Sequence, residues 1–153
     1  MPKIAIMMGS ASDEETMAAA NEYLNFFGIE FETVILSAHR TPEKTAEFAK
    51  TAEKNGFSLI IAGAGMAAHL PGVVAAYSTL PVIGVPLSGS ALNGMDALYS
   101  IVQMPAGVPV ATMAIGKAGA RNAAVFAAEI LALQFPSIKN KLQQFRSQGC
   151  VLN

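Results

Sequence analysis

Histidine is scarce in this chain of 153 residues, and one of its two histidines stands where proton transfer would be useful. His39 and Arg40 belong to the segment Ser37–Pro42 (SAHRTP), between a strand-like run and the start of a helical pattern. Imidazole exchanges protons near neutral pH, and a guanidinium binds phosphate or carboxylate through paired hydrogen bonds. A helix N-terminus and a neighbouring cation both favour the neutral imidazole. The pair predicts acid–base chemistry on an anionic ligand; a surface histidine beside a surface arginine is the alternative.

A second segment, Met8–Asp13 (MGSASD), suits a phosphorylated ligand. Its glycine permits a tight turn, and the first N–H groups of the following helix have no partner within that helix. Ser10 and Ser12 add hydroxyl donors, while Asp13 can accept hydrogen bonds from sugar hydroxyls. Ser12 also opens the sequence Ser-Asp-Glu-Glu, which is typical of a capping box. Its alternative role is therefore only to cap the helix.

A third segment, Gly63–Gly72 (GAGMAAHLPG), contains the other histidine, His69. Two glycines and an alanine in it match a loose form of the dinucleotide-binding fingerprint. That fingerprint needs an acidic residue about 20 positions further on, and none occurs between Met66 and Met95. A nicotinamide or flavin cofactor is therefore disfavoured, and the small residues would instead let a planar ligand lie against the backbone. His69 is either functional or a structural histidine among apolar residues.

Two further loops carry weaker signals. Pro86–Gly94 is interpreted as a lid or a subunit interface, and Gly116–Asn122 offers its cations to an anion or to solvent. The chain has no phosphate loop of the GxxxxGK type, no GxSxG nucleophile elbow and no carboxylate pair at the ends of its strands. Two separated histidines and Cys150 do not make a structural zinc site. We expect no metal.

Alternating apolar and amphipathic segments must position these loops. Short apolar runs predict strands at 3–8, 31–36, 59–62, 82–85 and 110–113. Helical patterns cover 12–27, 41–55, 69–76, 91–102, 118–133 and 137–148. This alternation predicts right-handed crossovers and one doubly wound α/β domain with a parallel sheet. Ligands bind such sheets at the carboxyl ends of the strands, where the three segments above lie.

Composition narrows the class of protein. Ten basic against eleven acidic residues give a net charge of −1, which argues against a nucleic-acid or anionic-membrane surface. Charged residues make up 14% of the chain, where about 25% is typical. None occurs between Asn55 and Met95, yet His69, Pro71 and several glycines interrupt every stretch long enough to span a membrane. We expect a homo-oligomer with apolar interfaces.

The length predicts a single domain, 1–153, with a core at about 3–133 and a helical extension at about 134–153. Cys150 is the only cysteine, so no intrachain disulfide forms, which is typical of a reducing compartment. Met1–Ile4 leads into a strand-like run without a signal-peptide pattern. The expected location is cytoplasmic.

Taken together and in order, six segments resemble the class I N5-carboxyaminoimidazole ribonucleotide mutase family of purine biosynthesis. They are MGSASD, SAHRTP, GAGMAAHLPG, LPVIGVP, ALYSIVQMP and VATMAIGKAGARNAA, and the match runs from Lys3 to Leu133. The resemblance implies a three-layer, flavodoxin-like α/β fold, an octamer and no cofactor. The implied reaction isomerises N5-carboxyaminoimidazole ribonucleotide to 4-carboxy-5-aminoimidazole ribonucleotide.

The resemblance also implies roles for individual residues. His39 matches the catalytic histidine, and His69 a second active-site histidine. The implied substrate-binding residues are Ser10, Ser12, Asp13, Ser37, Arg40, Gly65, Ala67 and Leu70. The substrate releases carbon dioxide in a closed pocket while the catalytic histidine protonates the departing nitrogen. The same histidine then takes the proton from the ring carbon that captures the carbon dioxide.

Two alternatives stay open at this point. The related class II carboxylases use carbon dioxide directly, and we expect them to carry lysine in place of Arg40 and a different third segment. Arg40 and GAGMAAHLPG therefore favour class I, although Met66 stands where relatives often have glycine. The other alternative is a non-catalytic, flavodoxin-like nucleotide-binding module, which would not require a titrating group at His39.

Overall fold

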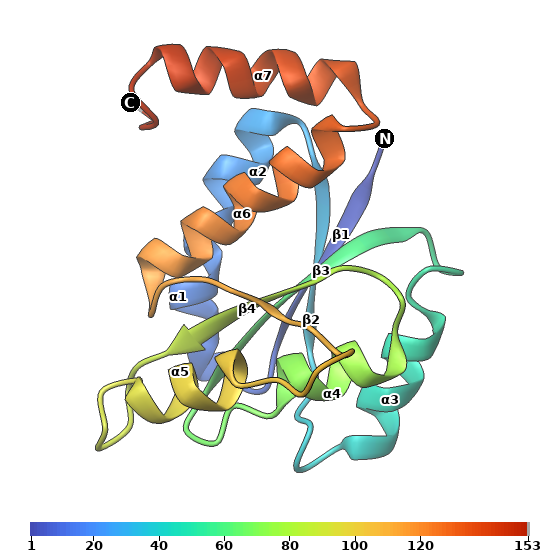
Figure 1. The fold of residues 1–153 in the computed structure, drawn as a ribbon, viewed down its shortest axis with the longest axis vertical. Coiled ribbons are helices and arrows are strands. Elements are labelled where there is room, and N and C mark those ends of the chain that lie inside the picture. The colour runs from blue at the N-terminus through green and yellow to red at the C-terminus, as the bar shows by residue number, and fades with distance from the viewer. Residues whose placement is uncertain (153) are drawn as a thin grey trace.

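Five parallel strands form one sheet in the order β2-β1-β3-β4-β5 (Figure 1). The structure is a computed structural model, and it describes residues 1–152. The strands are β1 (Lys3–Met8), β2 (Glu30–Ile35), β3 (Phe57–Gly65), β4 (Val82–Leu87) and β5 (Ala111–Thr112). The chain leaves β1 for β2 on one side and then returns to β3 on the other. The loops after β1 and β3 therefore diverge at the point where a doubly wound sheet opens a ligand crevice.

Helices cover both faces of the sheet, which gives the three layers that the resemblance implied. One face carries α1 (Glu14–Met17), α2 (Asn21–Phe27) and α6 (Lys117–Ala132), and α7 (Pro136–Ser147) packs on α2 and α6. The other carries α3 (Pro42–Thr51), α4 (Leu70–Tyr77) and α5 (Met95–Val102). Alternate residues of β1 serve the two faces: Ile4 and Ile6 belong to the first core, and Ala5 and Met7 to the second.

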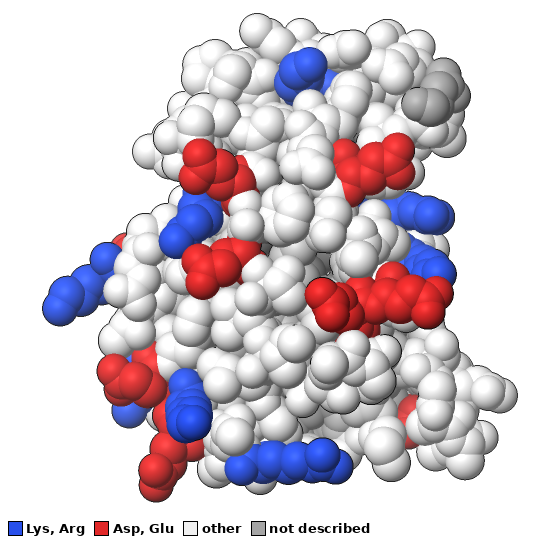
Figure 2. Space-filling model, turned by 180° about the vertical axis from the view of Figure 1, so that it is seen from behind, with Lys and Arg blue, Asp and Glu red and all other residues white. Residues whose placement is uncertain are grey.

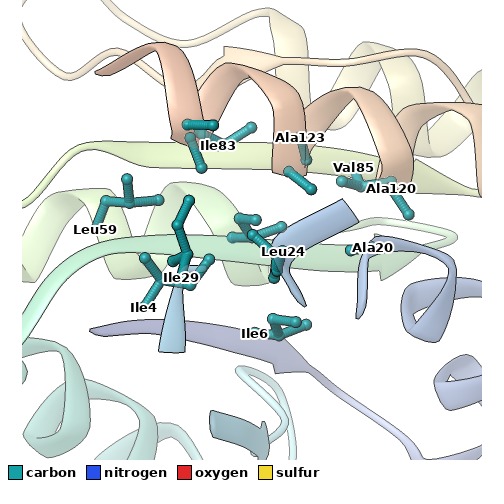
Figure 3. Close-up of a cluster of buried hydrophobic side chains, with 14 of the residues drawn as sticks. Ile4, Ile6, Ala20, Leu24, Ile29, Leu59, Ile83, Val85, Ala120 and Ala123 are labelled. Carbon is teal, nitrogen blue, oxygen red and sulfur yellow. The ribbon is translucent and has the colours of Figure 1, made fainter. Parts of the chain in front are cut away.

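The first core joins strands to small residues of α6. Figure 3 shows Ile4, Leu59 and Ile83 of the strands in the same cluster as Ala120 and Ala123 of α6, all of them fully buried. Alanines on the inner face of α6 let the helix lie close to the sheet, so that larger strand side chains fill the remaining space. Helix α7 adds Ile138 and Phe145 to the same core, so the C-terminal segment packs on its own chain.

The first helical segment departs from expectation. It is divided into a 3₁₀ turn at Ala11–Asp13, α1, a second 3₁₀ turn at Ala18–Ala20, and α2. The predicted capping box at Ser12 is wrong. The N-cap of this segment is Ser10, whose hydroxyl accepts a hydrogen bond from the Ser12 N–H at 3.2 Å. The predicted end is confirmed: Gly28 adopts φ +70°, the left-handed conformation that terminates helices.

Other boundaries move by a few residues. Strand β3 is longer than expected at both ends, α3 ends at Thr51 rather than near 55, and α5 begins at Met95 rather than 91. The shortened start of α5 follows from Asn93 and Gly94, which have φ of +52° and +86° and so break the helical path. Among residues 1–152, no helix is long and apolar enough to cross a membrane.

Candidate active site

A cavity of about 680 Å³ lies beyond the carboxyl ends of four neighbouring strands. Each of four loops contributes part of its lining. All ten site residues predicted from the sequence are among the lining residues. The lining residues are Gly9, Ser10, Ser12 and Asp13 after β1; Ser37, Ala38, His39 and Arg40 after β2; Ala64–Leu70 at the end of and after β3; and Ser88, Gly89 and Ser90 after β4. The topology thus brings together segments that are far apart in the sequence.

The cations at the start of α6, which the sequence offered to an anion or to solvent, are not among the described lining residues. Lys117 forms an ion pair with Glu15 at 2.9 Å, and Arg121 lines a separate hollow with Tyr23 and Phe145. Arg40 is therefore the one cation among the lining residues that the structure describes, and Asp13 is the one carboxylate. An anionic group of a ligand has a single charged partner in this cavity.

The two histidines meet, although 30 positions separate them. His39 Nε2 and His69 Nδ1 are 2.5 Å apart, and the rings are nearly edge to face, with centroids 4.4 Å apart and planes at 64°. A hydrogen bond of this kind needs one ring to donate an N–H and the other to accept, so the accepting ring is neutral. Both side chains are exposed. A structural histidine enclosed by apolar residues does not describe His69, and the pair can hold or pass a proton at the cavity surface.

Hydrogen bonds within the loop hold His39 at the edge of the sheet. The Ser37 hydroxyl accepts from the Arg40 N–H at 3.1 Å, and the Ser37 carbonyl accepts from the Thr41 hydroxyl at 2.9 Å. The same carbonyl accepts from the hydroxyl of Thr45 at 3.2 Å, and Thr45 is fully buried. The turn that carries His39 and Arg40 is thereby fixed to the first turn of α3 before any ligand binds. Thr45 supports the turn from below, and its only signal in the sequence is its position four residues after Thr41.

The loop after β1 presents two hydroxyls and a carboxyl whose pKa is raised. The hydroxyls of Ser10 and Ser12 are 2.9 Å apart, so one donates to the other and both remain near the cavity. Asp13 is half-buried. Burial raises the pKa of the Asp13 carboxyl, and a hydrogen bond with the backbone of Ser10 partly offsets that rise. A half-buried carboxylate of this kind gains from hydrogen-bond donors such as ligand hydroxyls.

The loop after β3 turns sharply between Gly65 and Ala68, where the Ala68 N–H donates to the Gly65 carbonyl at 2.9 Å. Met66 and Ala68 both have positive φ, +55° and +33°. Leu70 is 3% exposed and anchors the start of α4, whereas Ala67 is exposed toward the cavity. This wall is built from small residues and backbone, apart from Met66 and the ring of His69.

The fourth wall, Ser88–Ser90, lies in the segment interpreted from the sequence as a lid, a subunit interface or both, but none of its residues was predicted as a site residue. Ser90 donates from its hydroxyl to Asp96 Oδ1 at 3.0 Å and accepts from the Leu92 N–H at 3.3 Å, which fixes the loop to the start of α5. Gly89 adopts φ +114°, a conformation that requires glycine. The signal available in the sequence was a Ser-Gly-Ser segment directly after a strand, but it holds no titratable group.

The fold and cavity define a flavodoxin-like α/β protein with a hydroxyl-rich site that contains one cation and a hydrogen-bonded histidine pair. The AIR carboxylase family matches residues 3–149, and the chain belongs to that family. It is 56% identical over 146 residues to the N5-carboxyaminoimidazole ribonucleotide mutase of Vibrio vulnificus, covering 95% of this chain and 91% of the relative. The enzyme of the same name from Pyrococcus abyssi is also 56% identical over 146 residues, with 95% and 83% covered.

A solved structure agrees with the fold. The crystal structure of Treponema denticola PurE superposes with a TM-score of 0.88 at 30% identity, covering 98% of this chain and 92% of that one. The flavodoxin-like fold and the family resemblance expected from the sequence are confirmed. Among the described residues, no group of three or more His, Cys, Asp or Glu side chains is arranged to hold a metal ion.

Proposed function

We propose that this chain is the isomerase that converts N5-carboxyaminoimidazole ribonucleotide to 4-carboxy-5-aminoimidazole ribonucleotide in purine biosynthesis. The observation that carries this conclusion is the 56% identity, over nearly the whole chain, to relatives named as that mutase. Substrate and product are isomers, so the reaction needs no oxidant, reductant or second substrate. The contact between His39 and His69 supplies the proton transfer that the isomerisation requires.

Binding uses the three polar loops. Arg40 and the hydroxyls of Ser10 and Ser12 hold the phosphate, since Arg40 is the only cation among the described residues that line the cavity. Asp13 accepts from the ribose hydroxyls. This arrangement directs the imidazole ring toward the small-residue loop after β3 and toward the histidine pair.

The chemistry then proceeds in two steps. The carbamate N–C bond breaks, carbon dioxide leaves, the bonding electrons stay on nitrogen, and His39 protonates that nitrogen. The ring carbon C4 next attacks the carbon dioxide to form the new C–C bond, and its proton returns to His39. His69 accepts or returns this proton through its hydrogen bond with His39. Recombination is effectively intramolecular for the carbon dioxide that stays in the cavity.

The assembly and location are part of the proposal. We infer a homo-oligomer, an octamer by the family resemblance, because an apolar stripe on α5 lies exposed on the single chain. Its members are Met95, Tyr99 and Val102 of α5, together with Leu92 in the turn just before the helix. A cytoplasmic location fits a chain whose single cysteine, Cys150, precludes an intrachain disulfide.

A paired assay tests the activity. One reaction contains freshly made N5-carboxyaminoimidazole ribonucleotide, and the other contains aminoimidazole ribonucleotide with bicarbonate; both are followed for the C4-carboxylated product. Rapid conversion in the first reaction only is the expected result. Faster conversion in the second, in proportion to dissolved carbon dioxide, would identify a carboxylase instead. Conversion in neither would leave a nucleotide-binding module.

A further inference from the structure

Met66 occupies a backbone conformation that disfavours any residue with a Cβ. It is the first central residue of the turn from Gly65 to Ala68, with φ +55°. Positive φ brings Cβ against the backbone, and glycine is the residue that avoids this. The described chain places glycine at seven other positions of positive φ. Three other described residues with a Cβ, Ala68, Asn93 and Cys150, share a positive φ, but Met66 is the one among them that brings a long side chain to the cavity lining.

The side chain of Met66 also lies in an unfavourable place. It is 67% exposed and belongs to neither hydrophobic core. Among the lining residues that the structure describes, the one other large aliphatic side chain is Leu70, which is 3% exposed and packed into the second core. The neighbours of Met66 in the turn, Gly65 and Ala67, are small. Neither folding nor packing of this chain explains a long apolar side chain at this point, and strain retained beside a cavity points to function.

We propose that Met66 is the apolar cover of the cavity, and that it determines how much of the released carbon dioxide is retained for the second step. This inference rests on the proposed function. The methionine side chain is unbranched, has three rotatable bonds and adapts to the surface it covers. The loops after β1 and β4 offer serines and glycines, so Met66 is the lining residue suited to exclude water above an apolar gas.

The released carbon dioxide has two possible fates, and atoms and electrons balance in both. When carbon dioxide stays, C4 attacks it, the C–C bond forms and the C4 proton goes to His39. When carbon dioxide escapes, the carbamate and one proton have become aminoimidazole ribonucleotide and free carbon dioxide, and no C–C bond forms. A cover changes the partition between these outcomes without touching the groups that bind phosphate and ribose. Met66 is therefore a specificity-determining residue, separate from the proton-transferring pair.

The test follows the fate of the transferred carboxyl group. Substrate labelled with ¹³C at the carbamate is converted in unlabelled bicarbonate buffer, and both label in the product and free aminoimidazole ribonucleotide are measured. Spontaneous breakdown is subtracted with enzyme-free samples. Met66→Gly should lose label from the product several-fold and release several-fold more aminoimidazole ribonucleotide, with little change in KM. Its unfolding midpoint should not fall, because glycine relieves the positive φ.

Matched variants separate the cover from other effects. Met66→Leu keeps the apolar bulk and should retain label like the unmodified enzyme, whereas Met66→Ser removes the bulk and should behave like Met66→Gly. Cys150→Gly relieves a similar strain, φ +63°, at an exposed position outside the cavity lining and should leave the partition unchanged. Full label retention in Met66→Gly and Met66→Ser, or equal loss in Met66→Leu, would overturn the inference. Absence of any conversion by the unmodified enzyme would instead refute the proposed function.

Discussion

At the scale of single residues, the candidate site combines a hydrogen-bonded pair of histidines with one cation and one carboxylate. His39 and His69 share a hydrogen bond of 2.5 Å, while Arg40 and Asp13 are the charged members of the lining. Binding and chemistry therefore rest on different side chains, and substitutions should separate them. In the proposed function, the arginine and the serines hold the nucleotide and the histidines move the proton.

His39→Asn should abolish turnover while leaving nucleotide binding nearly intact. Asparagine retains a polar side chain at the turn but cannot give and then take a proton, and general acid–base catalysis is typically worth about 10²- to 10⁴-fold in rate. Stopped assays should show a loss in kcat of at least this size, and calorimetry with the product should give a dissociation constant within a few-fold of the original. Near-normal turnover would assign the proton transfer to another group.

Asp13→Asn should stabilise the fold at neutral pH while weakening substrate binding. Burial raises the pKa of the Asp13 carboxyl above its ordinary value of 3.8, so the folded state disfavours the ionised form. Below the ordinary value the carboxyl is protonated in both states and has no such cost; the cost develops as the pH rises through the folded pKa. Urea unfolding in buffers from acid to neutral pH should show the variant's advantage growing with pH. An advantage independent of pH would contradict this assignment.

At the scale of helices and strands, the close approach of α6 to the sheet depends on Gly119. A Cβ at this position would overlap the carbonyl oxygen of Ala114 and crowd Val85. Both contacts lie under the first turn of α6, so the helix would have to move away from the sheet. The same movement would separate Ala120 and Ala123 from the strands they cover.

Gly119→Ala should therefore destabilise the protein although alanine favours helices. The gain in helix propensity is about 1 kcal/mol, and the overlap with backbone outweighs it, for a net loss of about 2 kcal/mol in the free energy of unfolding. Urea denaturation measures this directly. Asn122→Ala is the matched control, since it is exposed on the same helix and should be neutral or slightly stabilising. Equal stability of Gly119→Ala and the parent would show that α6 can shift without cost.

The elements also show what the sequence could and could not predict. Apolar runs and Gly28 specified the strands and the end of the first helix, because burial and left-handed φ leave a clear trace in residue type. The 3₁₀ turn at Ala18–Ala20 left no such trace, because alanine favours the α-helix and this turn packs against α6.

The candidate site was predictable where titratable groups mark it. The Ser88–Ser90 wall was not, because its contribution is set by the hydrogen bond from Ser90 to Asp96.

At the scale of the whole molecule, one face of α5 lacks a partner. Tyr99 and Leu92 are 60% and 61% exposed, and Met95 and Val102 are 43% and 46% exposed. Met95, Tyr99 and Val102 are spaced four and three residues apart, which places them on one side of α5, opposite the buried Ala97 and Ile101; Leu92 lies in the turn just before the helix. Elsewhere, charges of both signs are interspersed over the face shown in Figure 2, with no patch of a single sign. The α5 stripe is thus an apolar surface suited to another copy of the chain rather than to a polyanion.

Tyr99→Asp should break this association. A carboxylate at the centre of a buried apolar contact loses its hydration without gaining a partner, so the assembly should dissociate into smaller species. Light scattering at micromolar concentration should show a homo-oligomer, an octamer by the family resemblance, for the unmodified protein and a markedly lower mass for the variant. Leu133→Asp is the control, because Leu133 is 90% exposed and lies outside the stripe; its mass should match the parent. A stable monomer in the unmodified protein would refute the association, and an unchanged mass in Tyr99→Asp would place the interface on another surface.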